Sequence, residues 1–73
     1  MQSPKHYANL VKFGRRLRDL RAAKGFSQET LALLSGLDRS YVGGVERGQR
    51  NVSLINILKL AAALDIEPRE LFS

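Results

Sequence analysis

Arginine is the residue type with which this sequence could do most of its chemistry. Eight of the twelve basic residues are arginine, and the formal net charge is +5. A guanidinium group presents five N–H donors in a planar fork that suits phosphates and other flat acceptors. Residues 1–50 hold ten basic and four acidic residues, whereas residues 51–73 hold two and three. A solvated basic surface would give this pattern too, but we interpret the basic front as a polyanion-binding side and the apolar back as a different contact.

Residues that could support catalysis or bind a metal are few. The sequence has no cysteine and one histidine, His6, near the N-terminus. Asp65, Glu67 and Glu70 lie close together in the sequence, but they fit a turn and the start of a short helix, where carboxylates are favoured. No glycine-rich phosphate-binding loop is present. We therefore predict neither an enzyme nor a cofactor or metal site.

The length of the chain predicts one small domain. With 73 residues and 44% hydrophobic composition, it is an ordinary globular sequence with a small core and no disulfide to support it. No apolar run approaches the ~20 residues of a membrane span. The first eight residues lack the apolar segment of a signal peptide, so a cytoplasmic protein is expected. A core of this size favours assembly with a second copy.

Apolar residues recur at helical spacing and no strand-like alternation is present, which predicts an all-α fold. The first helix begins either at Ser3-Pro4 or near Tyr7, so residues 1–8 are its start or a short arm. Residues 9–73 are predicted to form the helical domain. Four more helices follow Gly25, which ends the first. Ser27, Asp38 and Ser53 are predicted to cap the next three with their side chains, and Glu67-Pro68 begins the last.

The same spacing predicts which residues enter the core. Leu31 and Ala32 face inward from the second helix, together with either Leu34 or Ser35. The fourth helix has one apolar stripe, whose members are Leu54, Ile57, Leu58, Ala61 and Leu64.

The second and third predicted helices meet at Gly36, in a tight turn of the kind that a helix-turn-helix motif needs. Ala32 supplies a small residue where the two helices cross, and Val42 and Val45 supply inward apolar positions of the third helix. With these residues and the motifs Gly-Phe-Ser-Gln (25–28) and Glu-Arg-Gly (46–48), residues 13–72 resemble the lambda-repressor-like, Cro/XRE-type helix-turn-helix family. Segments 37–42 and 46–51 further resemble the controller proteins of restriction–modification systems.

This resemblance implies a compact five-helix domain that binds double-stranded DNA. The function it implies is a sequence-specific transcription regulator, acting as a homodimer on an inverted-repeat operator, with the third helix in the major groove. RNA polymerase is a further candidate partner. The implied base contacts are Arg39, Ser40 and Arg50, and the implied contacts to the DNA backbone are Gln28, Tyr41, Arg47 and Asn51. Tyr41 could instead pack on the second helix, and Asn51 could hold its loop.

The resemblance also implies a structural ion pair between Arg21 and Glu46, so we do not interpret Glu46 as a catalytic acid. Gly43 and Gly44 interrupt the third helix at a cost of about 0.8–1 kcal/mol each relative to alanine. Two explanations are open: the glycines allow the helix to approach DNA closely, or they make the helix flexible enough to adjust when it binds DNA.

Apolar residues in excess of what the core needs predict a twofold interface on the fourth and fifth helices. The competing surface is the edge of the second helix formed by Leu33 and Leu34. The same excess fits an antitoxin or co-regulator whose main contact is another protein, and the mass in solution distinguishes the two. The residues predicted for the twofold interface are Ile55, Ala62, Leu71 and Phe72.

Overall fold

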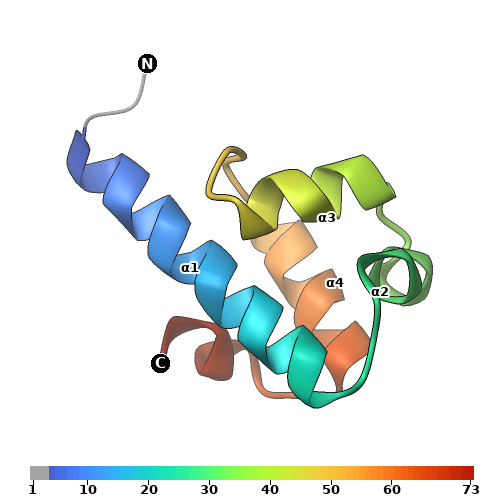
Figure 1. Cartoon of the computed structure of the whole chain (residues 1–73). Coiled ribbons are helices and arrows are strands. Elements are labelled where there is room, and N and C mark those ends of the chain that lie inside the picture. Colours follow the sequence, from blue (N-terminus) through green and yellow to red (C-terminus); the bar gives the residue numbers. More distant parts are fainter. Residues whose placement is uncertain (1–3) are drawn as a thin grey trace.

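The computed structural model describes residues 4–73, which form four α-helices followed by a short 3₁₀ helix (Figure 1). No strand occurs among these residues, and the predicted all-α class is confirmed. Helix α1 includes residues 4–8, while its predicted cap, Ser3, lies outside the described residues. The helices are α1 (Pro4–Ala23), α2 (Gln28–Ser35), α3 (Arg39–Glu46), α4 (Leu54–Leu64) and η1 (Pro68–Phe72).

Serine side chains begin α2 and α4 as predicted. The Oγ of Ser27 accepts a hydrogen bond from the N–H of Thr30 at 3.0 Å, and that of Ser53 accepts one from the N–H of Asn56 at 3.1 Å. Asp38 holds the equivalent position before α3, but its side chain makes no capping hydrogen bond. The capping role predicted for Asp38 is therefore wrong, and α3 lacks the side-chain cap that the other two helices have.

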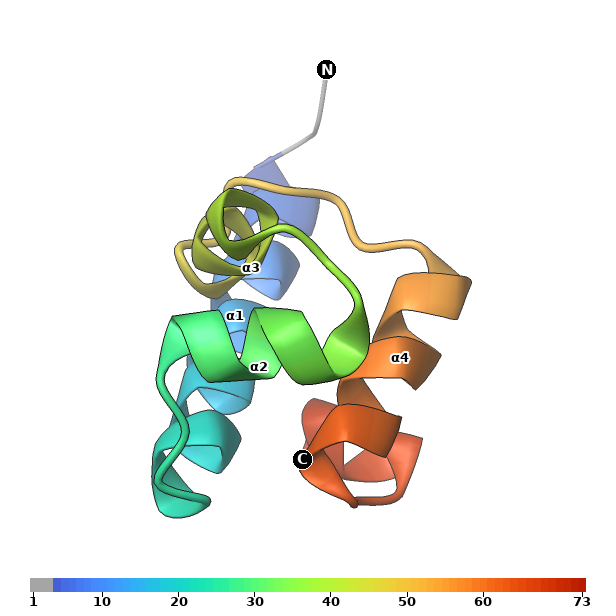
Figure 2. The same ribbon diagram turned by 90° about the vertical axis from the view of Figure 1, so that its right-hand side faces the viewer.

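The turn between α2 and α3 depends on Gly36. Its backbone is left-handed, with φ 72° and ψ 24°, a conformation that strains residues carrying a side chain. The N–H of Leu37 donates to the carbonyl of Ala32 at 3.0 Å, which closes the end of α2. Figure 2 shows the outcome: α2 lies across the view while α3, above it, is seen nearly end-on.

The core lies where α1, α3, α4 and η1 meet beneath α2, and its fully buried side chains are Leu17, Leu31, Leu60, Leu64, Leu71, Val42 and Val45. On α2, Leu34 is exposed and Ser35 is the inward residue, with its hydroxyl donating to the carbonyl of Leu31 at 2.7 Å. Leu54 and Leu58 are also exposed, against the prediction. The reason is that α4 packs against α2 and η1, which cover only part of its apolar stripe.

Gly14 allows α1 and α3 to approach closely. A Cβ atom added at Gly14 would lie 2.3 Å from the carbonyl oxygen of Val45 and 2.6 Å from that of Glu46. Both oxygens belong to the backbone of α3, so they cannot rotate away as a side chain would. The absence of a side chain at this position therefore sets how close the end of α3 lies to α1.

We expect Gly14→Ala to lower the free energy of unfolding by about 1–3 kcal/mol, because the added methyl group forces the two helices apart. This loss outweighs the gain of about 1 kcal/mol that alanine brings to a helix. Urea denaturation followed by circular dichroism measures it. Arg15→Ala, an exposed neighbour in α1, should change stability by less than about 0.5 kcal/mol. Equal midpoints for wild type and Gly14→Ala would contradict the close contact.

Candidate nucleic-acid interface

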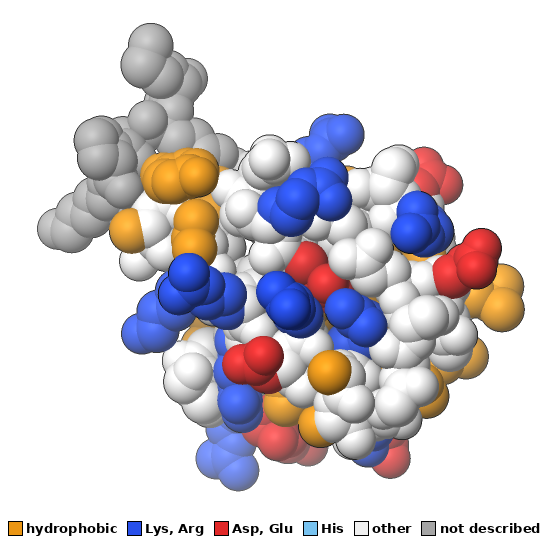
Figure 3. Space-filling view, in the orientation of Figure 1, with side chains coloured by type: hydrophobic (Ala, Val, Ile, Leu, Met, Phe, Trp, Pro, Cys, Tyr) orange, Lys and Arg blue, Asp and Glu red, His pale blue; other side chains and the backbone are white. Residues whose placement is uncertain are grey.

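The outward side of α3 carries the arginines predicted to contact DNA. Arg39 and Ser40 are exposed in its first turn, and Arg47 and Arg50 are exposed at its end and in the following loop. None of these three arginines forms an ion pair with another described residue. Figure 3 shows lysine and arginine side chains spread over α3 and α1 on this face. These three arginines therefore have no acidic partner among the described residues, and Arg47 alone among them donates a side-chain hydrogen bond there, from Nε to Oε1 of Gln49 at 3.1 Å.

Glu46, the last residue of α3, is held by side chains from two other helices. Arg21 donates from Nε to Oε2 at 2.6 Å and from Nη2 to Oε1 at 3.0 Å. Gln28 donates from Nε2 to the same Oε1 at 2.9 Å. Arg21 also donates from Nη1 to the carbonyl of Phe26 at 2.8 Å. The predicted ion pair is thus present, and it joins α1, the loop before α2, α2 and α3.

The pair is well shielded from water, since the side chains of Arg21 and Glu46 are only 15% and 3% exposed. The hydrogen bond to Glu46 raises the pKa of the Arg21 guanidinium; burial opposes this shift and the Coulomb attraction of the carboxylate adds to it. A group whose pKa is higher in the folded state than in the unfolded state stabilises the fold. This stabilisation is complete at pH below the unfolded-state pKa, and it is lost as the pH rises through the folded-state pKa. Both pKa values of Arg21 are far above neutral, so its contribution does not change between neutral and mildly basic pH.

Two predicted contacts to the DNA backbone already have partners inside the protein. Gln28 uses one amide hydrogen for Glu46, which leaves its second amide hydrogen and the N–H groups of the first turn of α2. The hydroxyl of Tyr41 accepts a hydrogen bond from Nδ2 of Asn56 at 3.1 Å, and its ring packs partly against the core. Tyr41 is therefore held by the core and by α4, while its hydroxyl hydrogen stays available to an acceptor.

Asn56 is a residue that sequence reasoning missed. It stands on α4, fifteen positions from its partner Tyr41, and no local pattern marks such a contact between helices. Asn51, by contrast, is exposed and its side chain makes no hydrogen bond within the described part of the chain. The alternative in which Asn51 holds its loop by a side-chain hydrogen bond finds no support.

Gly43 and Gly44 make room for side chains that cross the outer side of α3. A Cβ atom at Gly43 would lie 3.1 Å from Nη1 of Arg47 and 3.4 Å from Oε1 of Gln28. One at Gly44 would lie 2.8 Å from Cγ of Arg50. Both glycines are buried beneath these side chains. This accommodation is a third explanation of the two glycines, which the sequence did not suggest.

Exposed apolar residues form a second surface, on α4 and η1, which we call the C-terminal apolar face. Ile55 is 60% exposed, and Ala62 and Phe72 are exposed too. Leu71 is 1% exposed because η1 turns it into the core between α1 and α4, so its predicted place in the interface is wrong. Two residues that the periodicity assigned to the core join this face: Leu54 and Leu58.

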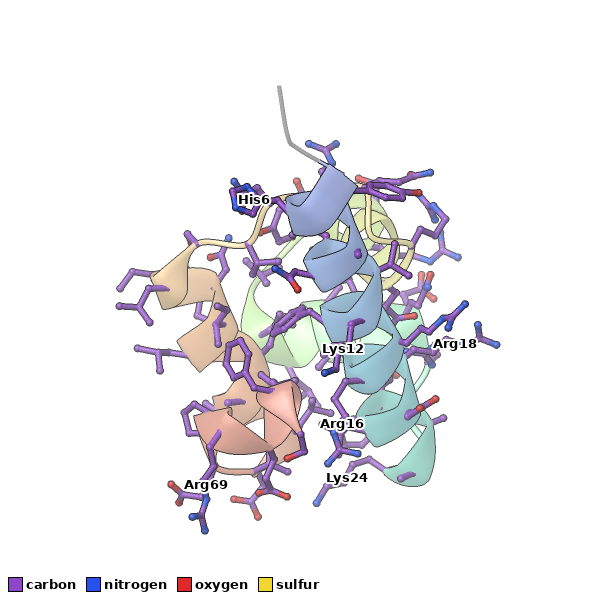
Figure 4. The ribbon with its side chains drawn as sticks, turned by 90° about the vertical axis from the view of Figure 1, so that its left-hand side faces the viewer. His6, Lys12, Arg16, Arg18, Lys24 and Arg69 are labelled. Carbon is purple, nitrogen blue, oxygen red and sulfur yellow. The ribbon has the colours of Figure 1, made fainter. Side chains whose placement is uncertain are left out.

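A second basic area lies away from α3. Figure 4 shows Lys12 and Arg16 along the edge of α1 that borders η1, whereas Arg18 projects from the other side. A cavity of about 320 Å³ opens there, lined in part by Phe13 and Phe72, whose ring centroids are 5.4 Å apart.

In the part of the chain that the structure describes, no three His, Cys, Asp or Glu residues are grouped as metal ligands would be. No helix in that part is long and apolar enough to cross a membrane.

Comparison with known sequences identifies the class of protein. The profile of the helix-turn-helix family matches residues 17–71, a span that contains α2, the Gly36 turn and α3. The chain therefore belongs to this family, in its Cro/XRE branch of DNA-binding regulators.

The individual proteins that the chain resembles include controller proteins of restriction–modification systems. The crystal structure of the controller protein C.AhdI from Aeromonas hydrophila is 88% identical, with a TM-score of 0.88 over 89% of this chain and 98% of that one. Control protein C.MunI from a Mycoplasma species is 47% identical over 64 residues, which is 86% of each chain. The controller C.Esp1396I, crystallised as a tetramer with its natural 35-base-pair operator, is 33% identical with a TM-score of 0.80 over 86% of this chain and 83% of that one.

Removal of the Glu46 carboxylate should destabilise the whole domain. We expect Glu46→Ala to lower the free energy of unfolding by about 3–5 kcal/mol, because Arg21 is left as a shielded charge without a partner. Thermal melts measure the effect. DNA binding should fall mainly with the folded fraction, with a smaller further loss because Gln28 no longer has Glu46 to hold it. Asp19→Ala removes an exposed carboxylate of α1 and should cost less than about 0.5 kcal/mol. A melting temperature for Glu46→Ala that equals that of Asp19→Ala would show that the pair is energetically neutral.

Proposed function

We propose that this protein is a sequence-specific transcription regulator of the restriction–modification controller type, which binds double-stranded operator DNA. One observation carries the proposal: Arg39 stands exposed and without an acidic partner in the first turn of the second helix of a helix-turn-helix. In this motif, that helix lies in the major groove with its N-terminal residues at the base edges. We therefore call α3 the recognition helix.

The roles of the individual side chains follow from their places on the recognition helix. Arg39, Ser40 and Arg50 face the groove and are assigned to base edges, where an arginine fork matches the O6 and N7 atoms of guanine. The residues assigned to the DNA backbone are Gln28, Tyr41, Arg47 and Asn51. Gln28 and Tyr41 are held by Glu46 and Asn56, so both would meet the phosphates from fixed positions.

A homodimer built on the C-terminal apolar face completes the proposal. Large apolar side chains gather there, and residues 51–73 carry almost no net charge, so two copies can meet without strong repulsion. A twofold contact at this face would orient both recognition helices toward successive major grooves about 34 Å apart. An inverted-repeat operator is the DNA sequence that matches this symmetry.

A second candidate function is that of an antitoxin or co-regulator whose main contact is another protein. The observation in its favour is Leu33, which is 81% exposed on α2 with Leu34 exposed beside it, outside the proposed interface. RNA polymerase, by contrast, is a further partner proposed for the regulator itself while it occupies DNA in the cytoplasm. A dimer in the absence of any partner favours the regulator; a monomer that assembles only with another protein favours the second function.

Arg39 and Arg47 should differ in what they contribute to DNA binding. We expect Arg39→Ala to lose about 1–3 kcal/mol of discrimination at one base pair, a guanine–cytosine pair, because its fork is aimed at a base edge. Arg47→Ala should weaken binding to all sequences alike, since it lies at the phosphate backbone. Selection from a random DNA pool, followed by affinity measurements, tests both. A wild-type protein that enriches no motif would refute the proposed function, and an unchanged motif for Arg39→Ala would refute the role of Arg39.

A charge on the C-terminal apolar face should separate the two copies. We expect Ile55→Glu to raise the dimer dissociation constant about 30-fold or more, because a central interface residue contributes about 2 kcal/mol or more. Sedimentation gives the mass, and circular dichroism should show unchanged helicity. Leu33→Glu, the same change on exposed α2, is the matched control and should stay dimeric. Monomers for Leu33→Glu and dimers for Ile55→Glu would move the interface to α2.

A further inference from the structure

The middle of the recognition helix has no side chain of its own on its outer side. Gly43 and Gly44 occupy it, and the side chain of Arg50 reaches over Gly44 from the loop that follows α3. A Cβ atom at Gly44 would lie 2.8 Å from Cγ of Arg50, 3.3 Å from Nε and 3.6 Å from Cδ. Three atoms along the same side chain thus rest against one glycine, so the arginine stem lies along the helix backbone.

We propose that Gly44 is a specificity-determining residue, which sets the path of Arg50 across the recognition helix and so aims its guanidinium at the base pairs. This inference rests on the proposed DNA-binding function and adds a positioning role to a residue that has no side chain to offer. Arg50 is the group that touches DNA, and Gly44 acts through it.

The position of the close contact along the arginine is what gives Gly44 this control. Cγ is the second carbon of the side chain, so a clash there cannot be relieved by moving the tip alone. A methyl group at position 44 would require a different rotamer at the start of the Arg50 side chain, or a shift of the loop. Either change redirects the guanidinium. Because Arg50 is exposed and forms no ion pair within the described residues, this movement would break no ion pair inside the protein.

Gly43 provides an internal comparison one residue away. A methyl group there would meet Nη1 of Arg47 at 3.1 Å and Oε1 of Gln28 at 3.4 Å, which are terminal atoms of two side chains assigned to the DNA backbone rather than to bases. These ends can give way by a few tenths of an ångström without a change in the path of either side chain. Both glycines lie inside α3, so alanine at either position improves the helix equally. Gly43→Ala and Gly44→Ala therefore differ mainly in what they do to Arg50.

The test is a selection of bound sequences from a random DNA pool with five proteins: wild type, Gly43→Ala, Gly44→Ala, Arg50→Ala and the double variant Gly44→Ala/Arg50→Ala. We expect Gly44→Ala to lose the preference, about tenfold, at the same base pair as Arg50→Ala. The double variant should resemble the single Arg50→Ala, because the two residues act as a unit. Gly43→Ala should keep the wild-type motif. Thermal melts should show that Gly44→Ala is at least as stable as wild type, which separates the lost preference from unfolding.

Each contrary result has a definite meaning. A wild-type motif retained by Gly44→Ala, while Arg50→Ala loses a base preference, would overturn the role of Gly44 and leave the proposed function intact. Independent, additive losses in the double variant would overturn it as well, since Gly44 would then act without Arg50. An Arg50→Ala protein that selects the wild-type motif would have the same consequence. If the wild-type protein selects no motif at all, both the proposed function and this inference fail.

Discussion

The buried carboxylate of Glu46 is the point on which the arrangement of the helices depends. It accepts hydrogen bonds from Arg21 of α1 and Gln28 of α2, and it ends the recognition helix itself. A carboxylate that is 3% exposed is costly unless its partners are in place, so the three helices must adopt one mutual geometry. Gly14 reinforces this geometry by bringing the backbone of α1 directly against the carbonyl of Glu46.

The same network brings the interior into contact with the DNA face. Gln28 is at once a ligand of Glu46 and a candidate phosphate contact, and Tyr41 is at once a neighbour of the core and a candidate DNA contact through its hydroxyl. Side chains fixed in this way lose little further conformational freedom when the protein binds DNA, which favours a high affinity for DNA. The arginines that would read bases are the opposite case, because they project from the surface without internal partners.

Local signals were sufficient to predict much of this fold. Ser27 and Ser53 cap their helices through contacts to residues three positions on, and Gly36 needs only its own backbone angles, so each is legible from a short stretch of sequence. The Arg21–Glu46 pair came from family resemblance. Periodicity failed at Leu54 and Leu58, and the argument from excess apolar residues failed at Leu71, because neither shows which neighbouring element covers an apolar side chain. Two contacts of the site could not be predicted in this way: Tyr41 with Asn56, and Gly44 with Arg50. Both depend on how separate segments pack against each other, which no local sequence pattern encodes.

The absence of a side-chain cap at Asp38 has a consequence for the motions of α3. This helix has eight residues, two interior glycines and no serine-type cap, so little in its own sequence keeps it helical. Two contacts keep it ordered. The burial of Val42 and Val45 holds its inner side, and the hydrogen bonds to Glu46 hold its last turn. The first turn, which carries Arg39, is thus where transient local opening costs the least free energy. Amide hydrogens of that turn would exchange with solvent sooner than those of α1 or α4, and a bound duplex would slow them by ordering the turn at an entropic cost.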